Sequence, residues 1–533
     1  MSVEILKNEI KATLDNSSEY RELLFKRGYL FTDKKQENLE NYPFYGNWKE
    51  TLVGDYYLYV HKDQTFYVCQ KDGLYSVIIG HAYNPFDMKW DENQICEDLI
   101  SCYKESTASY FDKISELTGL HIVIMIDGKK IIANQDACSL TGCYFGQVKD
   151  SVYITEHPQL VADLCDLVMN PKVEKLVLSK CYNIGNRNLP GNVTPYKELK
   201  RLGANTYLLY DGKFSINRFY PVAPHPEFVT EEEKAENVKK IGDLIHNGIK
   251  CCSEKWERCT ISLSGGTDSK TTLACANGLY DKFSYFSFHS KPQELVDAKG
   301  AKKICNNLGI EHTLYNIPQE NSEIKDFDFL KKILQHNTNY FVNLADNEIR
   351  KFIYLSRMDE YDIELKSWAS EVARVFFERK YKIKMPKTLN ERHLSVFQTR
   401  FFGHPLLLRW SDREYYKFLR EIGLEKTLYN FEHTDLIYWE VRMASWGVSV
   451  VSSQQLYHRT TMPMNNRKIL ELFLSFPHED RKSDWVHKQI MAYKNNKIIE
   501  ADVEIPNLYF HGYRILMEKV FFYLRTLLYI PKK

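Results

Sequence analysis

Up to about residue 220 the chain alternates apolar and polar positions, the pattern of half-buried β-strands. The stretch DYYLYVHKDQTFYVCQKDGLYSVIIG, from residue 55 to 80, predicts strands joined by hairpins at Lys62-Asp63 and Asp72-Gly73. The same alternation continues through further turns at Asp127-Gly128 and Lys149-Asp150, and GANTYLLYDGKFSINRFY closes the region. We therefore predict that the first part of the chain is a layered β-sheet domain of the α+β class.

Beyond residue 220 the periodicity changes. The segment PVAPHPEF places three prolines in eight residues, which is typical of a linker. A helical period follows in TEEEKAENVKKIGDLIHNGIKCCSEKWE, strand and helix alternate from residue 258, and helices dominate after about residue 390. This order predicts an α/β domain with a parallel sheet and a helical C-terminal part. The predicted division is 1–220 for the first domain, 221–229 for the linker and 230–533 for the second domain.

Composition excludes several classes of function. Lys and Arg number 71 against 70 Asp and Glu, a net charge of +1, so nucleic acid is not an expected main partner. No apolar run approaches the length of a membrane span, and the N-terminal stretch has no signal-peptide core. Twelve cysteines without an export signal predict reduced thiols and a cytoplasmic protein. Cys138 and Cys143 come nearest to a metal spacing, but we expect them to be buried small apolar residues.

The stretch TISLSGGTDSKTTLA, residues 260 to 274, contains the candidate ligand-binding loop. A buried strand leads into a serine- and glycine-rich loop and then into a helix. Glycines in such a loop allow positive φ and close approach of a ligand, and the amides at the helix start attract an anion. A carboxylate in this loop requires a cation such as Mg²⁺ between itself and a phosphate, unless it only caps the helix. The predicted phosphate-binding residues are Ser264, Gly265, Gly266, Thr267, Asp268 and Ser269, with Asp268 as metal ligand.

The spacing of the glycines separates this loop from a Walker loop. A G-x-x-x-x-G-K-[ST] loop ending at Lys270-Thr271 would need glycine at 264 and 269, and both positions are serine. The loop instead resembles the S-G-G-x-D-S signature of the ATP pyrophosphatase (PP-loop) superfamily at every fixed position. That resemblance implies binding of the pyrophosphate end of ATP and cleavage between the α and β phosphates.

Other stretches are similar to the asparagine synthetase-like family of this superfamily. FSYFSFHS and ELVDAKGAKKICNNLGIEHTLYNI resemble its adenosine strand and following helix, and MPMNNRKILELFLSFP resembles its later P-F-L-D helix. In the first domain, NQDACSLTGCYF stands where the family carries R-D-x-x-G-x-x-P-L-Y. The resemblance implies an N-terminal class II glutamine amidotransferase-like domain of Ntn-hydrolase-like fold. It also implies adenosine contacts from Leu263 and Phe288, with ATP and Mg²⁺ as cofactors.

Two departures from the family pattern matter. The catalytic Cys expected at position 2 is Ser2, so we expect no glutaminase activity of the chain's own. In KSWASEVARVF, Ser367 and Ser370 stand where the family has acids, whereas Glu371 is kept as a catalytic residue. Arg374 is predicted to bind pyrophosphate, because a guanidinium suits phosphate geometry. The alternative is that Glu371 and Arg374 form an ordinary surface pair at i,i+3 spacing.

The C-terminal region offers a candidate catalytic cation. The family resemblance implies a lysine beside the developing oxyanion, for which Lys482 and Lys488 are the candidates. Glu440 and Arg442 are expected to form a buried structural pair.

Together these observations predict a ligase that adenylates a small-molecule or peptide carboxylate and joins it to ammonia, from a separate source, or to a substrate amine. The oligomeric state stays open. A catalytically degenerate interaction protein and another PP-loop enzyme, such as a tRNA-modifying adenylating enzyme, are the alternatives.

Overall fold

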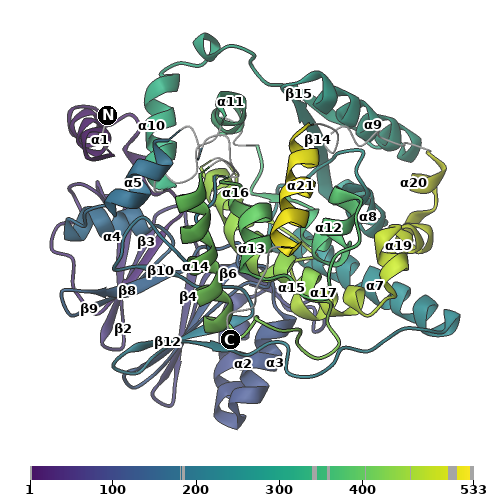
Figure 1. The fold of residues 1–533 in the computed structure, drawn as a ribbon, viewed down its shortest axis with the longest axis horizontal. Coiled ribbons are helices and arrows are strands. Elements are labelled where there is room, and N and C mark those ends of the chain that lie inside the picture. Colours follow the sequence, from purple (N-terminus) through teal and green to yellow (C-terminus); the bar gives the residue numbers. More distant parts are fainter. Residues whose placement is uncertain are drawn as a thin grey trace.

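The computed structural model describes residues 3–179, 182, 187–338, 345–356, 360–401, 404–456, 458–501 and 513–527. Ser2, on which the expectation about glutaminase activity depends, lies outside the described residues. Figure 1 shows the sheets of the first part beside the helices of the second.

Two six-stranded antiparallel sheets form the first part of the chain. The first sheet has the order β10-β8-β9-β1-β3-β2, built from β1 (Tyr29–Thr32), β2 (Trp48–Val53), β3 (Tyr56–His61), β8 (Tyr144–Val148), β9 (Ser151–Thr155) and β10 (Lys200–Arg201). The second has the order β12-β11-β7-β6-β5-β4, built from β4 (Phe66–Lys71), β5 (Leu74–Tyr83), β6 (Thr118–Asp127), β7 (Lys130–Gln135), β11 (Thr206–Tyr210) and β12 (Phe214–Arg218).

Helices cover both outer faces of this pair of sheets. Because successive side chains of a strand point to opposite faces, Phe31 packs between the sheets while its neighbour Leu30 faces outward. Helices α1 (Val3–Asn16), α4 (Pro158–Cys165) and α5 (Pro171–Val177) pack on the outer side of the first sheet. Helices α2 (Glu92–Glu105) and α3 (Thr107–Glu116) cover the second. The helix–sheet–sheet–helix layering confirms the predicted layered fold.

Three predicted hairpins are confirmed and one is wrong. The turns at Asp72-Gly73, Asp127-Gly128 and Lys149-Asp150 each join neighbouring antiparallel strands. The turn at Lys62-Asp63 instead connects β3 of the first sheet to β4 of the second. Since β3 pairs with β1 on one side and β2 on the other, it has no free edge for β4. Alternation along a strand shows which side chains are buried but not which strand becomes its neighbour.

The predicted parallel sheet is confirmed in the second part. Its order is β15-β14-β13-β16-β17, and every described neighbour is parallel. The strands are β13 (Cys259–Ser262), β14 (Phe283–His289), β15 (Thr313–Asn316), β16 (Ile363–Leu365) and β17 (Thr460–Thr461). The chain runs outward from β13 to β15 and then returns to the other side of β13. The boundary between β13 and β16 is therefore where the strand order reverses.

Helices surround this sheet in the part of the chain that the structure describes. Helix α7 (Glu231–Lys255) begins at a capping box formed by Thr230 and Glu233. The others are α8 (Thr267–Cys275), α9 (Pro292–Leu308), α10 (Phe327–Asn337), α11 (Asp346–Leu355), α12 (Phe376–Tyr381), α13 (Glu391–Leu394), α14 (Pro405–Glu421), α15 (His433–Ile437), α16 (Val448–Gln454), α17 (Arg467–Leu474), α18 (His478–Lys482), α19 (Trp485–Asn495), α20 (Lys497–Glu500) and α21 (Tyr513–Leu527). Short 3-10 turns span Arg21–Leu23, Tyr280–Lys282, Asn321–Glu323 and Trp368–Ala373, and π-helical segments span Ser395–Thr399 and Tyr438–Gly447.

Buried polar contacts join the two parts. Arg467 of α17 is 1% exposed, and its guanidinium donates to Asn205 Oδ1 at 3.1 Å and to the Gln135 carbonyl at 3.0 Å. Asn465 donates to Asp136 Oδ1 at 2.9 Å. These groups come from both sides of the interface, so their hydrogen bonds fix how the sandwich sits against the helices.

The expected pair of Glu440 with Arg442 is not formed. Glu440 is buried and instead pairs with Arg218 of β12 at 2.6 Å. The Arg442 guanidinium lies 4.7 Å from the centre of the Trp446 ring and 5.0 Å from that of Phe376. In the π-helical segment these two side chains leave the backbone toward different neighbours, which spacing alone does not reveal.

Candidate functional site

The loop at residues 263–266 lies at the carboxyl edge of the parallel sheet, directly after β13. The segment that follows β16, residues 366–375, starts from the same edge because β13 and β16 are parallel neighbours. In open α/β sheets, ligands bind outside the carboxyl ends of the strands where the strand order reverses. The fold therefore brings the loop and this second segment together at the expected binding position.

Side-chain and backbone contacts define the loop. Ser264 Oγ lies 2.9 Å from Ser269 Oγ and accepts a hydrogen bond from the Gly266 amide at 3.2 Å. Leu263 is fixed by its backbone, because its amide donates to the Phe286 carbonyl at 2.8 Å. Gly266 has φ −69°, so the predicted positive φ is wrong there. A Cβ at this position would lie 3.1 Å from Ser264 Oγ, so a larger residue would require the serine side chain to shift by a few tenths of an ångström.

Helix α8 starts at this loop with its amide groups facing the site. Gly266 is the N-cap and no side chain caps the helix, so Asp268 does not act as the cap. The first amides of a helix have no partners within the helix and favour an anion. One loop amide already has an internal carboxylate partner, because Gly265 donates to Asp297 Oδ1 of α9 at 2.8 Å. Burial raises the pKa of Asp297.

Arg374 is at the centre of the site. Its guanidinium contacts Asp268 Oδ2 at 2.7 Å, Glu371 Oε2 at 2.6 Å and both oxygens of Asp484 at 2.8 Å. The side chain is 6% exposed. The i,i+3 pair with Glu371 is thus present, but it is buried and shared with two further acids rather than lying on the surface. Three distant segments of the chain meet on this one guanidinium.

Ser370 and His487 complete the contacts of Asp268. Ser370 Oγ donates to Asp268 Oδ1 at 2.5 Å, and His487 Nε2 lies 3.1 Å from Ser370 Oγ. Asp484 Oδ2 also accepts from Thr267 Oγ1 at 3.3 Å and from Arg379 at 3.2 Å. Asp268 is therefore held by polar contacts from the β16 segment.

These contacts shift the pKa values of the cluster. Burial raises the pKa of Glu371 to about 6, against the opposing effect of Arg374. For Asp484, the hydrogen bond and charge of Arg374 outweigh burial and lower the pKa to about 2. Burial and the nearby arginine lower the pKa of His487 to about 4, so its imidazole is neutral at pH 7. At neutral pH the cluster thus has three carboxylates, two guanidiniums and a neutral imidazole.

The remaining predicted residues lie around this centre. Lys482 Nζ contacts Glu378 at 3.0 Å, and that hydrogen bond raises the pKa of the lysine. Lys488 is exposed on the first turn of α19 and forms no ion pair within the described ranges. Phe288 lies near the end of β14 with Lys351 Nζ 5.1 Å from its ring centre. Buried Ser367 has a hydroxyl without a hydrogen-bond partner among the described residues.

Sequence reasoning missed three groups that touch the loop or Arg374: Asp297, Asp484 and His487. Asp484 and His487 are three residues apart at the start of α19, a spacing that places both on one helix face. That spacing is a detectable signal, but only the fold places the face beside a loop more than two hundred residues earlier.

In the described part of the chain, no group of three or more His, Cys, Asp or Glu side chains is arranged to hold a metal ion. Among the described helices, none is both long and apolar enough to cross a bilayer.

One family model matches part of the chain. The model of the family described as asparagine synthase matches residues 240–349, which run from α7 through the loop and into α11. A comparison with curated proteins finds no match.

Two solved structures illustrate the structural comparison. A glutamine phosphoribosylpyrophosphate amidotransferase from B. subtilis, complexed with ADP and GMP, is 10% identical with a TM-score of 0.23. The match covers 57% of this chain and 62% of that one, so this chain spans less than two thirds of its length. A structure described as the allosteric regulatory enzyme of purine biosynthesis is 8% identical, with coverage of 64% and 90% and a TM-score of 0.24. TM-scores this low establish neither a shared fold nor a shared activity. Residues 240–349 thus form a domain similar to asparagine synthase.

Proposed function

We propose that the protein is an ATP-dependent ligase that activates a carboxylate as an acyl-adenylate and converts it to an amide. A carboxylate oxygen attacks the α-phosphorus, the bond to the bridging oxygen breaks, and pyrophosphate leaves. An amine nitrogen then attacks the acyl carbon, loses a proton, and AMP leaves. The amine is ammonia or an amine of the substrate.

One observation carries this proposal. The S-G-G-x-D-S loop lies between β13 and α8 at the point where the strand order of the sheet reverses, inside the segment that matches the asparagine synthase model. The helix start supplies amide donors for phosphate, and the hydroxyls of Ser264, Thr267 and Ser269 add further donors. A loop of this composition at this position is suited to the pyrophosphate end of a nucleotide.

The residues present fit a Mg²⁺ ion that a nucleotide also holds, although the described acids are not arranged to bind an ion by themselves. Asp268, Glu371 and Asp484 supply the hard oxygen ligands that Mg²⁺ prefers, and a nucleotide-bound ion needs only one or two of them beside phosphate oxygens. When bound, the ion would neutralise the charge that develops on pyrophosphate. Arg374 would donate to the phosphates once they compete with its present carboxylate partners, because its planar fork suits both.

The carboxylates of the site also disfavour a nucleotide that arrives without a divalent cation. With Glu371, Asp268 and Asp484 facing Arg374 and Arg379, the resting cluster offers no excess positive charge. A nucleotide that arrives without its cation would meet three carboxylates at short range. We therefore expect binding to require the divalent ion together with ATP.

We also propose that the protein takes its amine from outside rather than from glutamine hydrolysis of its own. The Val3 amide donates to Glu174 at 2.9 Å, which anchors α1 on the outer helical layer and not between the two sheets. Position 2, where the resembled family carries its catalytic Cys, is serine.

The decisive experiment measures ATP–pyrophosphate exchange and AMP release with a panel of carboxylates and ammonia. Asp268→Asn keeps the side chain's shape and should reduce exchange at least ~100-fold, as loss of a group that stabilises developing charge does. Asp281→Asn, at an exposed aspartate of the same domain with a side chain 76% accessible, is the matched control. Nucleotide binding without AMP from any carboxylate would contradict the ligase.

That outcome would instead favour a nucleotide-binding protein without catalysis. The specific observation behind this second candidate is Ser370, which replaces an expected acid and holds Asp268 at 2.5 Å. Adenylation of a tRNA in the same assay would point to the other PP-loop chemistry.

A further inference from the structure

A cavity of about 740 Å³ opens beside the candidate nucleotide site. Its wall is formed by the end of α12, the turn after it and helix α18. The lining residues are Glu378, Arg379, Lys382, Ile383, Lys384, His478, Glu479 and Lys482. Arg379 connects the cavity to the loop, because it contacts Asp484, which in turn accepts from Thr267.

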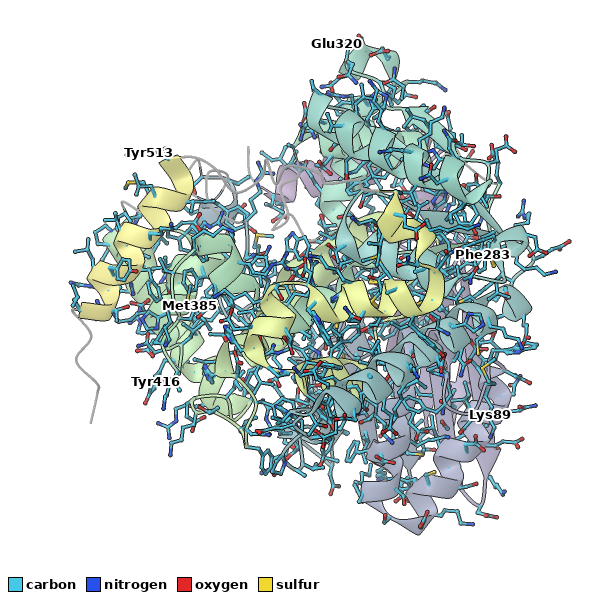
Figure 2. The ribbon with its side chains drawn as sticks, turned by 90° about the vertical axis from the view of Figure 1, so that its right-hand side faces the viewer. Lys89, Phe283, Glu320, Met385, Tyr416 and Tyr513 are labelled. Carbon is cyan, nitrogen blue, oxygen red and sulfur yellow. The ribbon has the colours of Figure 1, made fainter. Side chains whose placement is uncertain are left out.

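Positive charge dominates the lining. Four cationic side chains face two carboxylates, and one of those carboxylates is already compensated. Glu378 accepts hydrogen bonds from Lys482 at 3.0 Å, from His478 at 3.2 Å and from the Met385 amide at 2.9 Å. Met385 is labelled in Figure 2. Its hydrogen bonds are therefore satisfied within the protein.

Lys382 and Lys384 are the cations left over. Both are exposed, and neither side chain forms an ion pair or hydrogen bond within the described ranges. Lys382 has φ 53° and ends the six-residue helix α12, so the chain turns at this point. Two lysines in one cavity wall without an internal acid are available to an anionic ligand.

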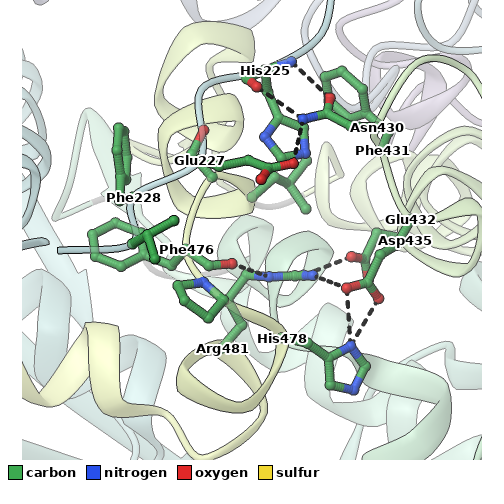
Figure 3. Close-up of a pocket in the computed structure, with 14 residues that line it drawn as sticks. His225, Glu227, Phe228, Asn430, Phe431, Glu432, Asp435, Phe476, His478 and Arg481 are labelled. Atoms are coloured by element: carbon green, nitrogen blue, oxygen red, sulfur yellow. Dashed lines mark hydrogen bonds and ion pairs between the residues drawn. The ribbon is translucent and has the colours of Figure 1, made fainter. Parts of the chain in front are cut away.

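A neighbouring cavity shows the contrast. It has a volume of about 290 Å³ and shares His478 with the first. Figure 3 shows that its buried cation, Arg481, is engaged by Asp435 at 2.6 Å and Glu432 at 2.7 Å. The Asn430 side chain is likewise bonded to the His225 carbonyl and to Glu227. The charged and polar side chains of that cavity thus bond to one another, whereas the Lys382 and Lys384 side chains have no such partner in the described chain.

We propose that the cavity binds the distal anionic end of a polycarboxylate substrate, such as an acidic small molecule or a peptide with acidic side chains. This inference rests on the proposed ligase activity, because the reacting carboxylate would lie at the loop while the second anionic group contacts Lys382 and Lys384. The net charge of +1 disfavours a nucleic acid as the ligand.

Binding can be tested without any nucleotide. Isothermal titration would compare triglutamate with trialanine on the wild-type protein, on Lys382→Gln/Lys384→Gln and on Lys387→Gln. Lys387 is an exposed lysine three residues beyond Lys384 that does not line the cavity, so it is the matched control. We expect triglutamate to bind the wild type and the control alike, with a dissociation constant about tenfold higher in the double variant.

Several results would overturn the proposal. These are equal affinity for triglutamate and trialanine, no effect of the double variant beyond that of Lys387→Gln, competition by ATP for the same site, or lysine-dependent binding of tRNA in place of the peptide. The direct titration with triglutamate contains no ATP, so a failure of adenylation leaves its result unaffected. Conversely, pyrophosphate exchange that is insensitive to the lysines would contradict only the cavity assignment.

Discussion

Replacing Arg374 with Gln removes the guanidinium on which Asp268, Glu371 and Asp484 converge. The three carboxylates would then face one another with Arg379 contacting only Glu371 and Asp484. Breaking a buried ion pair from one side costs about 3–5 kcal/mol, because the remaining charge is left uncompensated. Here the acids keep side-chain exposures of 15 to 22%, so water relieves part of this cost. We therefore expect a loss of about 3 kcal/mol at pH 7.

The loss should depend on pH with a definite sign. Without the guanidinium, the pKa of Glu371, which burial already raises to about 6, rises further above its unfolded value, and the lowered pKa of Asp484 rises as well. Folded protein then binds more protons than unfolded protein, so stability falls as pH rises. The difference from wild type should be larger at pH 8 than at pH 5. The variant should also gain stability from 10 mM Mg²⁺ relative to wild type, because three released carboxylates are hard oxygen ligands.

Thermal unfolding followed by circular dichroism at pH 5 and 8, with and without Mg²⁺, measures these effects. We expect Arg374→Gln to lower Tm by about 5 °C at pH 7. Arg379→Gln is the matched control, since this arginine touches two of the same acids but is 25% exposed, and it should cost about 1 kcal/mol. If Arg374→Gln were as stable as Arg379→Gln at both pH values and indifferent to Mg²⁺, the reasoning about the cluster would be wrong.

Two further predictions test a buried carboxyl group, Glu156, and a half-buried one, Asp297. Glu156 is 3% exposed, neither oxygen has a hydrogen-bond partner in the described chain, and burial raises its pKa to about 8. A raised acid pKa makes stability fall as pH rises from the unfolded value to the folded one. Glu156→Gln should therefore increase the free energy of unfolding relative to wild type by up to ~4 kcal/mol at pH 8, seen as a higher Tm, and change it little at pH 4.5. An equal shift at both pH values would refute that account. Asp297→Asn keeps an acceptor for the Gly265 amide but removes a negative charge beside the loop, so titration with ATP and Mg²⁺ should show affinity about threefold tighter than wild type. Asp297→Ala loses the acceptor and should bind more weakly; the opposite order would show that this carboxylate does not hold the loop.

Much of the fold could be predicted from local pattern. The parallel sheet follows from the alternation of strand and helix after residue 258, and the hairpin at Asp127-Gly128 follows from turn chemistry between alternating runs. The hairpin predicted at Lys62-Asp63 is wrong because the pairing of a strand depends on which sheet edges remain free after assembly. Likewise Glu440 pairs with Arg218 and not with Arg442, because the π-helical backbone changes the direction of each side chain.

The same distinction between local pattern and tertiary contact applies to the candidate site. The sequence by itself determined the loop from Ser264 to Ser269, its strand and helix, and the charge of Asp268, because these depend on neighbours within about ten residues. Only the tertiary structure decided what Asp268 touches. The reversal of strand order beside β13 brings Arg374 from the segment after β16, and the packing of α19 against α8 brings Asp484 and His487. Contacts between residues so distant in the chain depend on strand order and helix packing, and no local pattern of residue types encodes that order.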